Sequence, residues 1–145
     1  MIAFDTNLLV YAHREGVAQH SAARRAIEKA SKDGRGCGVA LPAVAEFWSV
    51  VTHPANIGGP ASAQEALGFL IMLTVDVGAT VWMPREGFWA RLMRSAADLG
   101  IKGSAIYDLQ IALVAFENGA SEIWTHDRNF STVPGLHVHD PLQER

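Results

Sequence analysis

The sequence is poor in the features that define several classes of protein. Its single cysteine, Cys37, cannot form an intrachain disulfide, and a reducing cytoplasmic location is expected. The 12 Lys and Arg nearly balance the 15 Asp and Glu, so any surface that binds nucleic acid must be local. The chain also lacks a cationic start and a long uninterrupted apolar run. We therefore expect neither a signal peptide nor a membrane span.

Hydrophobic residues, in contrast, are abundant and make up 49% of the chain, against 19% charged residues. This balance is typical of a folded globular protein rather than a disordered one. A length of 145 residues is enough for one domain with a substantial core and too short for two ordinary ones. We therefore expect a single domain over residues 1–145.

Short apolar runs alternate along the chain with longer segments of helical character. One helix is expected to start near Thr6. Ser62 and Glu65 form a capping-box pattern, which indicates the start of another helix. The alternation predicts an α/β layered fold with a mostly parallel sheet, whose ligand sites lie at the carboxyl ends of the strands. The expected strands are 2–4, 39–42, 79–83, 122–125 and 136–139, and the other expected helices are 18–33, 43–53, 66–73, 86–99 and 104–118.

Four acidic residues occupy apolar stretches or the ends of predicted strands. Asp5 carries the only charged side chain in the opening segment MIAFDTNLLVYA. Two acids are just as isolated within predicted helices, and a fourth follows a predicted strand: Glu46, Asp108 and Asp127. A buried carboxylate costs several kcal/mol unless something compensates its charge. The compensation can be structural, or it can be a metal ion.

Each of these acids has a structural interpretation when it is taken alone. Asp5 could cap a helix, and Glu46 could be a first-turn acid favoured by the helix dipole. Asp108 is harder to explain, because an Asp in the middle of a helix has poor propensity and no capping role. If the acids converge, their repulsion raises at least one pKa, and a hard divalent cation such as Mg²⁺ or Mn²⁺ removes that repulsion. Together the acids predict a metal site.

These residues resemble the four motifs of the PIN-domain ribonucleases, and in particular of the toxins in virulence-associated toxin–antitoxin pairs. The resemblance covers nearly the whole chain, with the motifs in the family's order. One position departs from the pattern, because Asn129 stands where the family often has a second acid in its last motif. The matching residues are Asp5-Thr6-Asn7, Glu46, Asp108 with Ala112, and Thr125-His126-Asp127 with Phe130.

The resemblance implies a three-layer α/β/α sandwich and an endoribonuclease that depends on Mg²⁺ or Mn²⁺. It also implies a cytoplasmic toxin that cuts RNA, is held inactive by a small antitoxin and forms a homodimer. The segment 67–73 is a candidate partner surface. The implied catalytic and metal-binding residues are Asp5, Glu46, Asp108 and Asp127, and the implied supporting residues are Thr6, Asn7, Thr125 and Asn129.

Two other functions compete with this interpretation. A phosphatase with an aspartyl nucleophile at Asp5 would need a second acid two residues later, where the chain has Asn7. A catalytically weak PIN-like scaffold that binds RNA or protein is favoured only by Asn129.

The basic residues give a weaker indication of RNA contacts. The run from Arg24 to Arg35 is interpreted as the solvated face of a helix, with phosphate contact as the alternative. Arg91, Arg94 and Lys102 precede the Asp108 segment, and we predict that they guide RNA.

Overall fold

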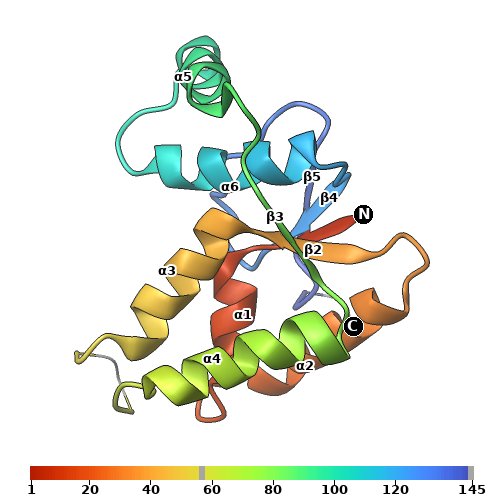
Figure 1. Ribbon diagram of the computed structural model, residues 1–145, viewed down its shortest axis with the longest axis vertical. Helices are drawn as coiled ribbons and strands as arrows, with labels where there is room; N and C mark the ends of the chain where they lie inside the picture. Colours follow the sequence, from red (N-terminus) through yellow and green to blue (C-terminus); the bar gives the residue numbers. More distant parts are fainter. Residues whose placement is uncertain (56–57, 144–145) are drawn as a thin grey trace.

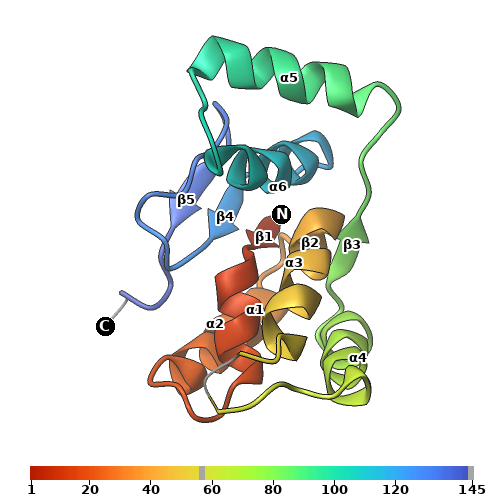
Figure 2. The ribbon, with the colours of Figure 1, turned by 90° about the vertical axis from the view of Figure 1, so that its left-hand side faces the viewer.

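A computed structural model describes residues 1–55 and 58–143 and shows three layers. One parallel sheet of five strands, in the order β3-β2-β1-β4-β5, lies between α1 to α4 on one side and α5 and α6 on the other (Figures 1 and 2). This confirms the expected α/β/α sandwich. The strands are β1 (Ile2–Phe4), β2 (Cys37–Ala40), β3 (Thr80–Trp82), β4 (Glu122–Trp124) and β5 (His137–His139), and the helices are α1 (Thr6–His13), α2 (His20–Lys32), α3 (Leu41–Thr52), α4 (Ala63–Ile71), η1 (Met72–Asp76), α5 (Phe88–Leu99) and α6 (Ala105–Glu117).

The central strand is the first segment of the chain. All three residues of β1 are fully buried, as the apolar run at the start of the sequence requires. β1 pairs in parallel with β2 on one side and with β4 on the other. Because Phe4 lies opposite Trp124, the residues that follow them, Asp5 and Thr125, leave the sheet at the same edge.

The helix boundaries follow from local chemistry that is visible in the sequence. The predicted capping box at the start of α4 is confirmed, since Oγ of Ser62 accepts from the Glu65 amide and the Glu65 carboxylate accepts from the Ser62 amide. Gly100 ends α5 in a left-handed conformation with φ of 65°. The prediction for the second strand was wrong by two residues, because Leu41 and Pro42 already form the first turn of α3.

One element was not predicted. α4 continues directly into the π-helix η1, whose wider turns leave helical hydrogen-bond donors and acceptors to be satisfied in other ways. The hydroxyl of Thr74 donates to the carbonyls of Leu70 and Ile71 in the preceding turn. The segment 56–62, NIGGPAS, is predicted to be a loop by its Gly and Pro content, and it lies partly outside the described residues.

The core is formed where the sheet meets both helix layers. Gly38 of β2 lies against the neighbouring strand with no room for a side chain, because a Cβ at this position would lie 2.5 Å from the indole of Trp82. Trp124 of β4 is also buried. No helix within the described part of the chain combines the length and apolar character needed to span a membrane.

Candidate active site

Asp5 is buried at the carboxyl end of β1, with 6% of its surface exposed. Its two carboxylate oxygens accept hydrogen bonds from the Thr6 amide and the Thr125 hydroxyl, each at 2.7 Å. Burial raises the pKa of Asp5 from its ordinary value of 3.8 to about 6, and the nearby charges of Asp108 and Glu46 add to the rise. Asp5 is therefore the N-cap of α1 and at the same time a carboxylate whose charge is poorly compensated.

Glu46 approaches the same place from α3, which packs against both α1 and α6. Glu46 is exposed, but partial desolvation of its carboxyl raises the pKa, the Thr6 hydroxyl partly offsets the rise, and the charge of Asp108 adds to it. The interpretation of Glu46 as a first-turn acid was wrong, because α3 begins at Leu41 and has no acidic residue in its first turn. The helix dipole therefore gives no account of this carboxylate.

Asp108 lies on α6, and its predicted position in the middle of the helix was wrong. It lies in the first turn of the helix rather than in the middle, because α6 begins at Ala105, and the helix dipole favours a carboxylate there. Burial nevertheless raises its pKa, and the charge of Asp127 adds to the rise. The Ser131 amide lies 3.5 Å from its Oδ2, at the limit of a hydrogen bond. Asp108 is thus close enough to Asp127 for their charges to interact.

Thr125 is the centre of a hydrogen-bond network that holds this edge of the sheet together. Its hydroxyl donates to Asp5 and accepts from the Asn7 side-chain amide at 3.2 Å and from the Asp127 backbone amide at 3.1 Å. The side-chain oxygen of Asn7 accepts from the backbone amide of His126 at 3.3 Å. Asn7 and Thr125, which the resemblance implied as supporting residues, therefore link the first strand of the chain to the fourth.

Asp127 and Asn129 lie in the exposed loop that follows β4. The Asp127 carboxylate accepts from the Asn129 backbone amide at 2.9 Å, a turn that fixes the carboxylate locally. Phe130 is buried and anchors the end of the loop. The side chain of Asn129 is solvent-exposed, and its role stays a prediction.

The donors at this edge fit a hard cation that keeps part of its water shell. Among residues 1–55 and 58–143, no three acidic, His or Cys side chains are close enough to form a complete metal-binding group. Mg²⁺ is commonly held by only one or two carboxylates, with water as the remaining ligands. The Thr6 hydroxyl is buried and has no hydrogen-bond partner of ordinary geometry within the described residues. The oxygen donors, their raised pKa values and a buried hydroxyl whose contact with Glu46 falls short of hydrogen-bond geometry all suit a divalent cation at the site.

The edge also contains one residue that the sequence analysis missed. Asp140 directly follows β5, and its Oδ2 lies 2.9 Å from Nδ1 of His126. An acid directly after a predicted strand was the same signal that identified Asp5 and Asp127, and it could have identified Asp140 as well.

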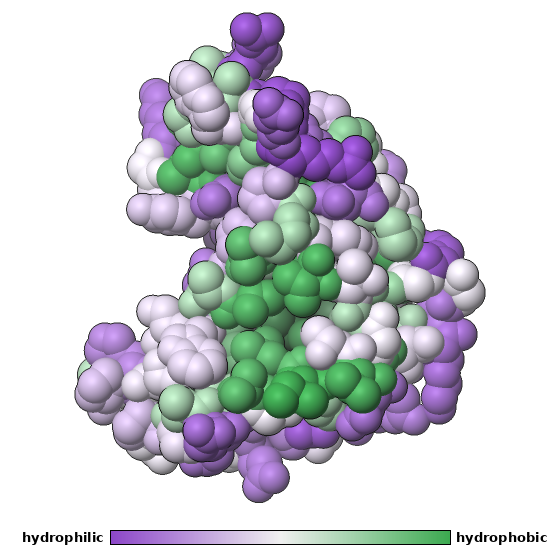
Figure 3. Space-filling model, viewed as in Figure 1, coloured by the Kyte–Doolittle hydropathy of each residue, from purple (hydrophilic) through white to green (hydrophobic). Residues whose placement is uncertain are grey.

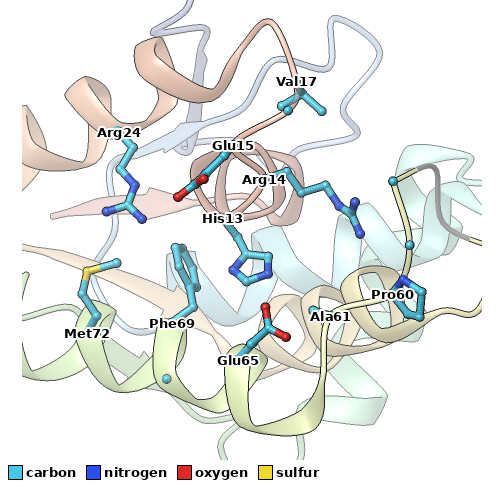
Figure 4. Close-up of a pocket in the computed structure, with 14 residues that line it drawn as sticks. His13, Arg14, Glu15, Val17, Arg24, Pro60, Ala61, Glu65, Phe69 and Met72 are labelled. Atoms are coloured by element: carbon cyan, nitrogen blue, oxygen red, sulfur yellow. The ribbon is translucent and has the colours of Figure 1, made fainter.

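A pocket of about 980 Å³ lies at the opposite end of α1 from Asp5. His13, Arg14, Glu65 and Phe69 are among its lining residues, and the His13 ring points into it (Figure 4). None of the four predicted acids lines this pocket, and its two arginines are balanced by two glutamates. The pocket is therefore separate from the candidate active site.

Four of the basic residues considered in the sequence are engaged elsewhere. Arg24 donates to the Ala12 carbonyl, which supports a structural interpretation of the basic run. Lys32 pairs with Glu28, and Arg35 with Asp33 and Glu122. Arg91 forms a bidentate ion pair with Glu117, at the opposite end of α6 from Asp108. This ion pair holds Arg91 in place and weakens the prediction that Arg91 guides RNA.

Known proteins resemble the chain along nearly its whole length. The PIN domain family model matches residues 2–136. Ribonuclease VapC43 of Mycobacterium tuberculosis is 31% identical over 142 residues, which cover 98% of this chain and 96% of the relative. Ribonuclease VapC48 of the same species is 25% identical over 139 residues, with 96% of each chain covered.

Solved structures show the same fold at low sequence identity. Mycobacterium tuberculosis VapC20, described as a toxin that cleaves the sarcin-ricin loop, superposes with a TM-score of 0.68 at 14% identity, over 90% of this chain and 92% of that one. FitAcB from Neisseria gonorrhoeae gives a TM-score of 0.64 at 18% identity, over 99% of this chain and all of that one (100%). At these identities the likeness concerns the fold alone.

Proposed function

The chain belongs to the PIN-domain family, and from this premise we propose that it is a divalent-metal-dependent endoribonuclease, the toxin of a type II toxin–antitoxin pair. One observation carries the proposal. Asp5 after β1, Glu46 on α3 and Asp108 on α6 all have raised pKa values, chiefly through desolvation, and the charge of Asp108 adds to the rise at Asp5 and Glu46. The charge of Asp127, in the loop after β4, adds to the rise at Asp108. The names of the relatives, which are ribonucleases, support the reaction class.

In the proposed site, Asp5 and Asp108 are the first-choice ligands for Mg²⁺ or Mn²⁺, with Glu46 and Asp127 as further ligands, directly or through water. Each oxygen of Asp5 accepts one hydrogen bond and keeps a lone pair for a cation. When bound, such a cation lowers the pKa of water and stabilises charge on a scissile phosphate. Its positive charge would also offset the repulsion that raises the carboxylate pKa values.

The other residues of the network hold and orient these carboxylates. Thr125 fixes one oxygen of Asp5, and its own position is fixed by the amides of Asn7 and Asp127. The Thr6 hydroxyl, which lies near Glu46 without a hydrogen bond of ordinary geometry, would be available to a ligand-bound water or to the substrate. Asn129 would contribute a carbonyl oxygen but no charge, so it weakens a second cation position more than the first.

RNA cleavage with added Mg²⁺ or Mn²⁺ tests the proposal directly. We expect cleavage by the wild type to stop with a chelator, and Asp108→Asn and Asp127→Asn to lower its rate by at least about 100-fold, as the loss of an electrostatic contact to the reacting groups commonly does. Asp76→Asn is the matched control, because it makes the same chemical change at an exposed position in η1. Cleavage that persists in both site variants, or that ignores the chelator, would overturn the proposal. Absence of both RNA cleavage and divalent binding would favour the scaffold.

We also propose an antitoxin partner and a homodimer for this chain. Leu67, Ile71 and Val75 are exposed at helical spacing along α4 and η1, partly within the segment predicted to contact a partner. Hydrophobic residues gather on this face over α4 (Figure 3). Light scattering should give the mass of two 15.7 kDa chains. Co-purification with the product of a short neighbouring reading frame should fail for Ile71→Glu if this stripe is the contact.

A further inference from the structure

We propose that His126 and Asp140 form a positioning pair that fixes the loop after β4 and thereby places Asp127 for the cation. The inference rests on the proposed function, because Asp127 matters for the reaction only if the acids act together. His126 lies within the last motif but was given no role there, and Asp140 belongs to no motif used above to predict the site. The pair joins the exits of two neighbouring strands, β4 and β5.

The hydrogen bond within the pair has an ordinary length and is partly buried. The Nδ1–H group of His126 donates to Oδ2 of Asp140 at 2.9 Å, and the two side chains are 28% and 18% exposed. The other oxygen of Asp140 accepts from the Leu142 amide at 3.0 Å, which holds the carboxylate in one orientation. Asp140 is therefore a fixed acceptor rather than a mobile surface acid.

His126 is also seated on one face of α1. Its backbone amide donates to the side chain of Asn7, and its ring meets the edge of the Tyr11 ring at a centroid distance of 6.0 Å. Asn7 and Tyr11 are four residues apart and therefore share a face of the helix. Three contacts from two elements thus define the position of His126.

Asp127 depends on these contacts because its own carboxylate is tied only locally. Its Oδ1 accepts from the Asn129 amide within the same loop. Among the hydrogen bonds of the described residues, the side-chain bond from His126 to Asp140 joins this loop to β5 beyond the sheet ladder. Its loss would remove one restraint on the first part of the loop, whose other end stays anchored by Phe130, and would allow the Asp127 carboxylate to shift relative to Asp108. The effect would be on the position of the Asp127 carboxylate, since neither His126 nor Asp140 needs to touch the cation.

Three variants of the full chain separate this role from a general structural one. His126→Phe keeps a ring against Tyr11 and removes the bond to Asp140, whereas His126→Asn restores a donor close to the position of Nδ1. His20→Phe is the matched control, because Nδ1 of His20 also forms a 2.9 Å hydrogen bond, to the Tyr11 carbonyl, and lies in α2. Two readouts are measured: Mn²⁺ binding by calorimetry, and exchange of the Asp127 and Asn129 amides in the metal-free protein.

We expect His126→Phe to weaken Mn²⁺ binding about tenfold, the lower end of the usual range for the loss of a residue that orients a metal ligand. The same variant should speed exchange of both amides, and His126→Asn should restore most of both properties. His20→Phe should change neither. If the wild type binds Mn²⁺ and His126→Phe binds it equally well, the positioning role is overturned while the proposed function stands. If the wild type binds no Mn²⁺, the proposed metal dependence fails by itself, and unchanged amide exchange in His126→Phe would overturn the positioning role as well.

Discussion

Replacing Asp5 with Asn should stabilise the metal-free protein at alkaline pH, although it removes a residue central to the proposed reaction. At pH 8 the Asp5 carboxylate is ionised while buried near Glu46 and Asp108, and its raised pKa measures the cost of that arrangement. Asn has nearly the same shape but carries no charge. The variant therefore removes the electrostatic cost and keeps the packing at the end of β1.

The magnitude follows from the pKa of Asp5 and its two hydrogen bonds. A rise from 3.8 to about 6 corresponds to about 3 kcal/mol of destabilisation in the ionised form, because each tenfold change in proton affinity is 1.36 kcal/mol. Asn has one acceptor oxygen, so one of the bonds from Thr6 and Thr125 is lost, at about 1 kcal/mol. The net gain is about 2 kcal/mol, or about 4–8 °C in Tm for a domain of this size.

The stabilisation should depend on pH with a definite sign. Between pH 3.8 and about 6 the folded protein keeps the Asp5 proton that the unfolded chain releases, so wild-type stability falls as pH rises through this window. Glu46 and Asp108, whose pKa values are also raised, act in the same direction. Asp5→Asn should therefore exceed the wild type at pH 8 and lose this advantage at pH 4.5, where Asp5 is already protonated.

Urea denaturation of the metal-free proteins at the two pH values measures the difference. Asp76→Asn, an exposed change of the same chemistry, should shift the free energy of unfolding by less than about 0.5 kcal/mol. Added Mn²⁺ should stabilise the wild type more than Asp5→Asn. An Asp5→Asn protein that is less stable than the wild type at pH 8, or whose advantage is the same at both pH values, would refute the electrostatic argument.

Three further substitutions test other parts of the structure. Gly38→Ala should destabilise the protein by about 1–3 kcal/mol in denaturant titration, because its Cβ would overlap the Trp82 indole. Gly68→Ala is its control and should stabilise α4 by about 0.5–1 kcal/mol, since nothing lies within 4 Å of the new methyl group. Ser62→Ala removes half of the capping box and should lower Tm through a loss of about 1 kcal/mol, with no change if the box contributes nothing. Asn129→Asp should lower the Mg²⁺ concentration needed for half-maximal RNA cleavage, and an unchanged requirement would show that residue 129 does not act on the cation.

The alternating elements of the fold could be predicted because their patterns are local. Strand and helix periodicity, the Ser62 cap and the Gly100 stop all lie within a few residues of the element that they define. The π-helix after α4 could not be predicted, because the composition of η1 suits an α-helix equally well. Its wider turn is a matter of hydrogen-bond register, which the sequence does not encode in residue type.

The candidate site was predictable as a list of residues but not as an arrangement. The isolation of Glu46 and Asp108 in apolar segments was visible. The position of Glu46 was misjudged because α3 begins two residues earlier than predicted, whereas Asp108 was placed in the middle of its helix although the predicted start at 104 is within one residue of the observed start. The hydrogen bond from Thr125 to Asp5 joins residues 120 positions apart, and no local pattern can reveal such a contact. Asp140 was missed although its place after a strand was visible.

The pairing of β1 with β4 determines when the site can exist during synthesis of the chain. β1 is made first, but the strand that places Thr125 against Asp5 begins only at Glu122. Until that strand has left the ribosome, β1 lacks one of its two neighbours and Asp5 lacks one of its two hydrogen bonds. Under the proposed function, a nascent chain would therefore be harmless to the RNA around it, and activity would appear only once nearly all of the domain has been made.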